Sequence, residues 1–177
     1  MFINLVINKY KMDSIQLRQI QEPLKAKYRE NAEAAFITLK AAAKVGEGIT
    51  CKIETGKMLS EAGLHPATGG DGLSVCSGDM LLEALAACAG VTLKAVATAI
   101  EFDLQDAQIL TEGDLDFRGT LSVDKNAPVG FKAIRLRFQL QTSEPADKIA
   151  NLIKLTERYC VVYQTLLKSN AVEVSIA

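Results

Sequence analysis

The longest apolar segment of the chain lies within residues 69–101, GGDGLSVCSGDMLLEALAACAGVTLKAVATAIE. A glycine-rich loop opens it, and the pattern then becomes helical, with Glu83 and Lys94 as the only charged residues between positions 80 and 100. A helix that is apolar on nearly every side is a buried one. Its alanine content and charged ends argue against a membrane span. We therefore expect the rest of the protein to wrap this helix.

The start and the faces of this helix follow from its sequence. Ser77 is expected as its N-cap, and Asp79 places a carboxylate in the first turn, where the helix dipole favours it. At 3.6 residues per turn, one face carries Leu81, Ala84, Leu85, Cys88 and Thr92.

After this helix the apolar residues alternate with polar ones. The alternation covers residues 115–123 and again 134–140, on either side of the loop DKNAPVG. This pattern predicts two antiparallel strands with one covered and one wet face. Arg118, Arg135 and Arg137 then belong to the wet face.

The N-terminal part combines helical and strand patterns. Residues 14–31 are helical in period, and Pro23 predicts that a second helix begins there, since proline suits a first turn. Residues 35–43 and 49–54 look like two strands of a hairpin, with Cys51 in the second. Residues 59–72 have the composition of a loop.

The C-terminal part predicts two helices and a closing strand. Pro145 opens the first helix, Cys160 marks the junction, a short helix follows over 161–168, and residues 171–177 form the strand. Cys160 is thus placed near a helix N-terminus, where a thiolate is favoured. The whole pattern predicts an α+β fold.

Composition narrows the function classes. A chain of 177 residues is most simply one domain, and a net charge of -1 gives no reason to expect nucleic acid or an anionic membrane as partner. The N-terminus is not a convincing signal peptide. Four cysteines at wide, unmatched spacings form neither a zinc signature nor a dense disulfide framework, which favours a reducing cytoplasm.

Cys88 and His65 are the candidate chemical groups, and each has a structural alternative. A free cysteine in an alanine-rich helix is usually a small core residue. His65, the only histidine, could be a base or a ligand, but no metal spacing supports it, and a structural role is preferred. A hydrolase or acyl transferase that pairs Cys88 with His65 is a weak alternative, since no Asn or Asp signature accompanies it.

Two cysteine contexts together carry a resemblance to a known family. GDMLLEALAAC, ending at Cys88, is similar to the PEELLLAALGAC helix of the osmotically inducible protein C / organic hydroperoxide resistance (OsmC/Ohr) family. ERYCVVYQTL, around Cys160, is similar to its second motif, HxxCPVSxTL. The resemblance covers about residues 35–177, which we take as an OsmC-like domain, and leaves residues 1–34 as an N-terminal helical extension.

The resemblance implies a fold, an assembly and a reaction. The fold would be antiparallel sheets around a long buried helix, in an intertwined homodimer. The reaction would be thiol-dependent reduction of organic hydroperoxides: Cys88 becomes a sulfenic acid, Cys160 resolves it as a disulfide, and a lipoyl or thioredoxin-like dithiol reopens that bond. No metal or organic cofactor is required. The alternative is a non-enzymatic member that binds a small apolar ligand or partner.

This chain departs from the family in the residues around the cysteines. The family's Glu, ten residues before the reactive cysteine, is Gly78 here, with Asp79 as a possible substitute. The family's activating Arg on the first strand is missing, so the basic group would come from Arg29, Lys40 or Lys44. Since a thiol in an apolar helix without a partner has a raised pKa, we expect Cys88 to be a slow nucleophile.

Overall fold

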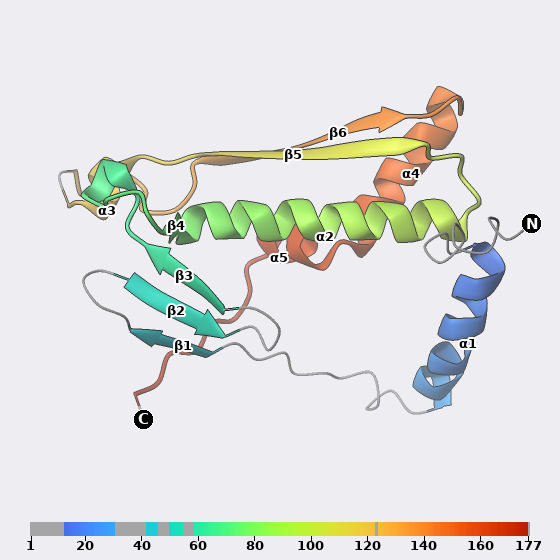
Figure 1. Ribbon diagram of the computed structural model, residues 1–177, viewed down its shortest axis with the longest axis horizontal. Coiled ribbons are helices and arrows are strands. Elements are labelled where there is room, and N and C mark those ends of the chain that lie inside the picture. Colours follow the sequence, from blue (N-terminus) through green and yellow to red (C-terminus); the bar gives the residue numbers. More distant parts are fainter. Residues whose placement is uncertain (1–12, 31–41, 46–49, 55–58, 123, 177) are drawn as a thin grey trace, which may run out of the picture.

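The structure is a computed structural model that describes residues 13–30, 42–45, 50–54, 59–122 and 124–176. It has the α+β fold expected from the sequence. Helix α2 (Ser77–Ala99) runs along the molecule, with strands β5 (Asp106–Asp114) and β6 (Ala133–Gln141) above it in Figure 1. Helices α4 (Ala146–Tyr159) and α5 (Val161–Leu167) also pack on α2. These helices position Cys88 and Cys160, the cysteines of the two motifs described above.

Strands β5 and β6 form the predicted antiparallel pair, in register from Asp106↔Gln141 to Asp114↔Ala133. The first strand, however, was predicted in the wrong place: residues 115–123 contain the short helix α3 (Phe117–Thr120). The carboxylate of Asp116 caps that helix by accepting a hydrogen bond from the Arg118 amide at 3.2 Å. Local capping therefore overrides the alternating pattern there.

The two faces of the β5–β6 hairpin differ as predicted. Its inner face packs Ala107, Ile109, Phe138 and Leu140 against the core. The hydroxyl of Thr111 donates to the Leu82 carbonyl of α2 at 3.1 Å and ties the hairpin to the helix. On the outer face, Arg135 and Arg137 pair with Glu112 at 3.1 and 3.2 Å. Arg118 lies on α3 and pairs with Asp116.

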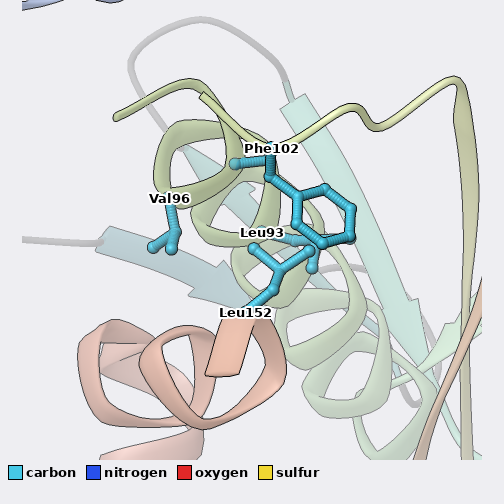
Figure 2. Close-up of a cluster of buried hydrophobic side chains, with 5 residues drawn as sticks. Leu93, Val96, Phe102 and Leu152 are labelled. Atoms are coloured by element: carbon cyan, nitrogen blue, oxygen red, sulfur yellow. The ribbon is translucent and has the colours of Figure 1, made fainter. Parts of the chain in front are cut away.

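The main core lies between α2, α4 and the turn after α2 (Figure 2). Its buried residues are Leu93, Val96, Ala97, Phe102 and Leu152. The predicted inner side of α4 is confirmed, since Leu152 and Thr156 are fully buried and Ile149 and Ile153 pack against the core. The core therefore fixes α4, and with it the junction to α5, against one side of α2.

A small sheet lies beside the start of α2, in the order β1-β2-β3-β4. The predicted hairpin is confirmed by the antiparallel pairing of β1 (Ala42–Val45) with β2 (Thr50–Glu54), which holds Cys51. Residues 35–41 and the turn at 46–49 lie outside the described residues. The predicted loop 59–72 was partly wrong, because it contains strand β3 (Leu59–Gly63) and the 3-10 helix Pro66–Thr68. Strand β4 (Val75–Cys76) then leads into α2.

The N-terminal segment forms a single helix, α1 (Ser14–Glu30), so the predicted break at Pro23 was wrong. Asp13 and Gln16 close its first turn: the Gln16 amide donates to the Asp13 carboxylate at 2.7 Å, and the Asp13 amide donates to the Gln16 side chain at 3.1 Å. This reciprocal cap starts the helix nine residues before the proline, which the continuing helix then tolerates. The hydroxyl of Ser14 donates to Glu101 at 2.8 Å, beyond the end of α2.

Two expectations about α2 need correction. Ser77 is its first helical residue, while Cys76 occupies the N-cap position and makes no side-chain capping bond. Along its length the helix is buried on one face only, at Leu85, Ala89, Leu93, Val96 and Ala97, and Val91 is 73% exposed. By length and composition α2 could cross a membrane. Its packing against β5, α4 and α5 is that of the core helix of a soluble domain.

The predicted closing strand is also absent from the single chain. Residues 171–176 form no strand, and no ladder pairs them within the described part of the molecule. Their apolar side chains are almost fully in solvent: Val172 is 83% exposed, Val174 92% and Ile176 101%. The apolar side chains of residues 171–176 are therefore not packed against the rest of the single chain.

Candidate functional site

The structure brings the two predicted cysteines together. Cys88 lies in the middle of α2, and Cys160 forms the junction between α4 and α5. Both are free thiols, and each lies close enough to the other to shift its pKa. Cys160 is 1% exposed, whereas Cys88 is only half-buried. A small reactant can therefore reach Cys88 more readily than Cys160.

The junction geometry explains why α5 begins beside Cys88. Cys160 has extended backbone angles, φ −74° and ψ 108°, so α4 ends there and a new helix starts at Val161. The first amide groups of a helix have no partner within the helix. Here the N–H groups of Val161 and Val162 donate to the sulfur of Cys88. Thr92, one turn further along α2, makes a smaller contribution that also lowers the pKa of Cys88.

These donors reverse the expected pKa shift of Cys88. Burial is the largest single effect and raises the pKa of the thiol. Hydrogen bonds from the Val162 amide, the Cys160 thiol, the Val161 amide and the Thr92 hydroxyl act against it and bring the pKa below its ordinary value. The expectation of a raised pKa at Cys88 was therefore wrong, since it considered only ionic partners.

The pKa of Cys160 shifts in the opposite direction. Burial raises the pKa of the Cys160 thiol, and the hydrogen bond to Cys88 and the charge of a Cys88 thiolate raise it further. The Tyr163 and Val162 amides lower it too little to compensate. The prediction that Cys160 favours a thiolate was thus wrong: the amides at the start of α5 act on both sulfurs, and at Cys160 burial and the neighbouring Cys88 outweigh them. The pair consists of one activated thiol and one protonated thiol that donates to it.

Of the other predicted site residues, Asp79 does not join this pair within one chain. Asp79 is exposed in the first turn of α2. The nine residues from 79 to 88 correspond to roughly 14 Å of helix. The side chain of Arg29 and those of Lys40 and Lys44 lie outside the described residues, so activation by a basic group stays a prediction.

Gly78 occupies an apolar environment. A Cβ atom at this position would lie 3.5 to 3.6 Å from Phe131, the Cys76 sulfur and Leu115. Phe131 and Leu115 therefore border this position at the start of α2.

His65 has the structural role that was preferred for it. Its Nδ1 accepts a hydrogen bond from the Ala67 amide at 3.1 Å and caps the 3-10 helix. Its ring stacks on Phe117 with centroids 4.9 Å apart. It lines a cavity of about 340 Å³ together with Cys76 and Gly78, at the start of α2. The twelve residues from 76 to 88 correspond to roughly 18 Å of helix, which argues against a Cys88–His65 pair.

A second, larger cavity with a mostly apolar lining lies beside α5. It has a volume of about 500 Å³ and is bordered by β6, α4, α5 and Leu85, which lies one turn before Cys88. Its polar lining side chains are Lys132, Glu157 and Tyr163. Among the described residues, no group of three or more His, Cys, Asp and Glu side chains could hold a metal ion.

Thr92 and the Val161 and Val162 amides were not predicted from the sequence to act on the Cys88 thiol. Thr92 was placed on the face of Cys88, and its spacing of four residues is the signal that could have identified it as a donor. The amides carry no side-chain signature, so only the fold could show where they point.

Comparisons with known proteins agree with this fold. The family model described as OsmC-like protein matches residues 69–176. The OsmC-like protein of Mycoplasma pneumoniae has a similar structure, with a TM-score of 0.64 and 16% identity over 74% of this chain and 88% of that one. A search among curated proteins found no match.

Two further solved structures are similar and carry descriptions of function. One is an organic hydroperoxide resistance protein OsmC of Legionella pneumophila, with a TM-score of 0.59 and 19% identity over 75% of this chain and 90% of that one. The other is an organic hydroperoxide resistance protein of Elizabethkingia anophelis, with a TM-score of 0.59 and 14% identity over 73% and 88%. At these identities the likeness shows the fold.

Proposed function

The chain belongs to the OsmC-like protein family, and from this premise we propose that it is a thiol-dependent peroxidase that reduces organic hydroperoxides. The observation that carries the proposal is the contact between Cys88 and Cys160, in which Cys88 has the lowered pKa. A peroxidatic cysteine must be a thiolate that substrate can reach, and its resolving partner must lie within bonding reach.

The first step consumes the peroxide. The Cys88 thiolate attacks the terminal oxygen of the hydroperoxide, the O–O bond breaks, and an alkoxide leaves and takes up a proton to become the alcohol. Cys88 becomes a sulfenic acid, oxidised by two electrons, while the peroxide is reduced by two. The uncharged donors around the sulfur favour the thiolate that begins this step.

The second step uses Cys160. Its sulfur, after loss of the proton, attacks the Cys88 sulfenic sulfur, an S–S bond forms, and water leaves. An external dithiol then reduces this disulfide and is itself oxidised. We propose a lipoyl or thioredoxin-like dithiol for this role in the cytoplasm, where such reductants keep protein thiols reduced.

We further propose that the active protein is an intertwined homodimer. The exposed side of α2 and the alternating segment 171–176 present apolar side chains to water in the single chain, including Val91 at 73% and Ile176 at 101% exposure. A second copy would cover them in a symmetric assembly. In such a dimer the basic group near Cys88 would come from Arg29, Lys40 or Lys44 of either copy, with Asp79 as its anchor.

The direct test measures free thiols and peroxide together. Fully reduced protein is mixed with an organic hydroperoxide, and the loss of thiols and peroxide is followed with time. We expect two thiols to be lost per peroxide in the wild type and no fast loss in Cys88→Ser. Cys76→Ser is the matched control and should behave as the wild type. Equal peroxide consumption by Cys88→Ser and the wild type would end the proposal.

A second candidate function rests on the cavity of about 500 Å³. A non-enzymatic member of the family would bind a small apolar ligand there without using its thiols. This candidate predicts binding of an apolar fluorescent probe that is unchanged in Cys88→Ser, with no peroxide-dependent thiol loss in either protein. The experiment above therefore separates the two functions.

A further inference from the structure

The segment from Val129 to Ala133 passes between the two cavities described above. Val129 and Gly130 border the smaller cavity, of about 340 Å³, at the start of α2. Lys132 and Ala133 border the larger cavity, of about 500 Å³, beside α5. Phe131 lies between these two pairs and is the one described residue that borders both cavities. The two cavities therefore meet at Phe131.

The ring of Phe131 lies between strand β5 and the start of α2. A Cβ atom added to Gly113 of β5 would lie 2.6 Å from the ring Cδ1, so the ring occupies space that any side chain at Gly113 would need. On the other side, the ring Cζ lies 3.5 Å from the position of a Cβ atom on Gly78 of α2. The Lys132 amide donates to the Asp114 carbonyl at 2.8 Å and fixes the backbone directly after Phe131. The ring therefore spans from the strand to the helix and separates the cavities.

The larger cavity lies beside the two cysteines. Leu85 borders it and precedes Cys88 by three residues of α2, and Glu157 borders it and precedes Cys160 by three. Residues three apart in a helix are neighbours on one face. Lys132 and Glu157 give the mostly apolar lining one positive and one negative charge, so the cavity favours a ligand without net charge. An uncharged chain whose head reaches Cys88 can place its tail here.

We propose that Phe131 is a specificity-determining residue: its ring is the end wall of the larger cavity and limits the length of the unbranched apolar chain that fits there. The inference rests on the proposed function for the identity of the ligand, an organic hydroperoxide. Without the ring, the larger cavity would open into the smaller one, which Cys76 borders. A longer chain could then bury methylene groups that the wild type leaves in water, and each one strengthens binding about fourfold.

The test measures how tightly the reduced full chain binds unbranched primary alcohols from hexanol to dodecanol, by displacement of an apolar fluorescent probe. Such alcohols are products of the proposed reaction, and their binding uses no thiol. In the wild type, affinity should rise about fourfold per methylene and then level off where the chain meets Phe131. In Phe131→Ala the rise should continue, so that dodecanol binds about tenfold more tightly than to the wild type.

Leu136→Ala is the matched control, because Leu136 borders the larger cavity and not the smaller one. It widens the larger cavity and leaves the ring of Phe131 in place, so affinity should level off at the same chain length as in the wild type. If thermal unfolding shows that Phe131→Ala does not fold, Phe131→Leu removes the ring and keeps an apolar side chain. It should shift the length limit in the same direction, by a smaller amount.

Cys76 reports the position of the chain, because it is a free thiol that borders the smaller cavity. Its alkylation by iodoacetamide is followed by mass spectrometry of the Cys76 peptide, with and without dodecanol. The alcohol should slow this reaction in Phe131→Ala, where the chain reaches the smaller cavity, and leave it unchanged in the wild type.

An unchanged length limit in the Phe131 variant overturns the inference, as do an equal extension in Leu136→Ala, a Cys76 thiol that dodecanol fails to protect in the Phe131 variant, and a wild type that binds none of the alcohols. Peroxide consumption is measured in parallel on the wild type. A length limit that moves in the Phe131 variant without peroxide consumption would leave the role of Phe131 standing and remove the peroxidase proposal. Peroxide consumption with an unchanged limit would do the reverse.

Discussion

At the scale of residues, the lowered pKa of Cys88 is a balance between burial and hydrogen bonding. Burial removes water from the sulfur and disfavours the charged form. Four uncharged donors replace that water, and together they outweigh the loss. In the single chain the pKa of Cys88 is thus lowered without an ionic partner among the described residues. Because no net charge is involved, this kind of activation is less sensitive to salt than an exposed ion pair.

Cys160 has a testable role of its own. In Cys160→Ser the hydroxyl can still donate to Cys88, so the first reduction of peroxide should proceed, but no disulfide can form. We expect one equivalent of peroxide to be consumed quickly, followed by a sulfenate or by its overoxidised products on Cys88. Mass spectrometry detects the added oxygen atoms, and dimedone traps the sulfenate. Sustained turnover of this variant with the same dithiol would contradict the resolving role of Cys160.

At the scale of elements, the start of α5 supplies two of the donors to Cys88. Its position follows from the break at Cys160, whose amide still bonds to Thr156 at 2.9 Å and whose carbonyl accepts the Gln164 amide at 2.9 Å. The chain thus remains hydrogen-bonded through the junction while the helix changes direction. This leaves the Val161 and Val162 amides free to face α2.

Val161→Pro tests this element directly. Proline is favoured in the first turn of a helix, and the extended backbone at Cys160 is compatible with a following proline, so α5 should persist. The N–H donor is lost, and we expect the midpoint of the pH dependence of Cys88 alkylation to rise by about half a pH unit. Val161→Ala, which keeps the amide, should leave the midpoint unchanged. Identical midpoints in the two variants would show that this amide does not support the thiolate.

At the scale of the whole molecule, the single chain leaves a large apolar surface uncovered. Helix α2 is buried along one face, and Val172, Val174 and Ile176 stand in water at the C-terminus. Apolar surface of this extent usually marks an interface. The alternating pattern of residues 171–176 is that of a strand, and a strand needs a neighbour to satisfy its backbone groups.

We therefore expect an obligate homodimer that loses stability when the C-terminal segment is removed. Sedimentation of the wild type should show a dimer at micromolar concentration, and deletion of residues 171–177 should shift it toward monomer or unfolded chain. The double variant Glu173→Thr, Ser175→Thr keeps the apolar positions and should remain dimeric. A stable, folded wild-type monomer at micromolar concentration would contradict the prediction.

Much of the fold was determined by the sequence itself, because it depends on local periodicity. The helical pattern of α2, the alternation of β6 and the amphipathic pattern of α4 each reflect a single element that buries one face. The two cysteine motifs likewise identified Cys88 and Cys160 as a pair, and the structure places the two thiols close enough for each to shift the pKa of the other. The error at residues 115–123 arose where the side-chain cap at Asp116 overrode the alternating pattern, whereas at Pro23 the helical period of the segment prevailed over the proline.

Only the tertiary structure decided which thiol is activated. The pKa of a cysteine depends on the groups that surround its sulfur in space, and here those groups come from α2, from the junction at Cys160 and from the start of α5. Sequence pattern assigned the helix start to the nearest thiol along the chain, Cys160. The packing of α4 on α2 places that helix start beside both sulfurs, and the greater effect of burial at Cys160 leaves Cys88 as the thiol with the lowered pKa.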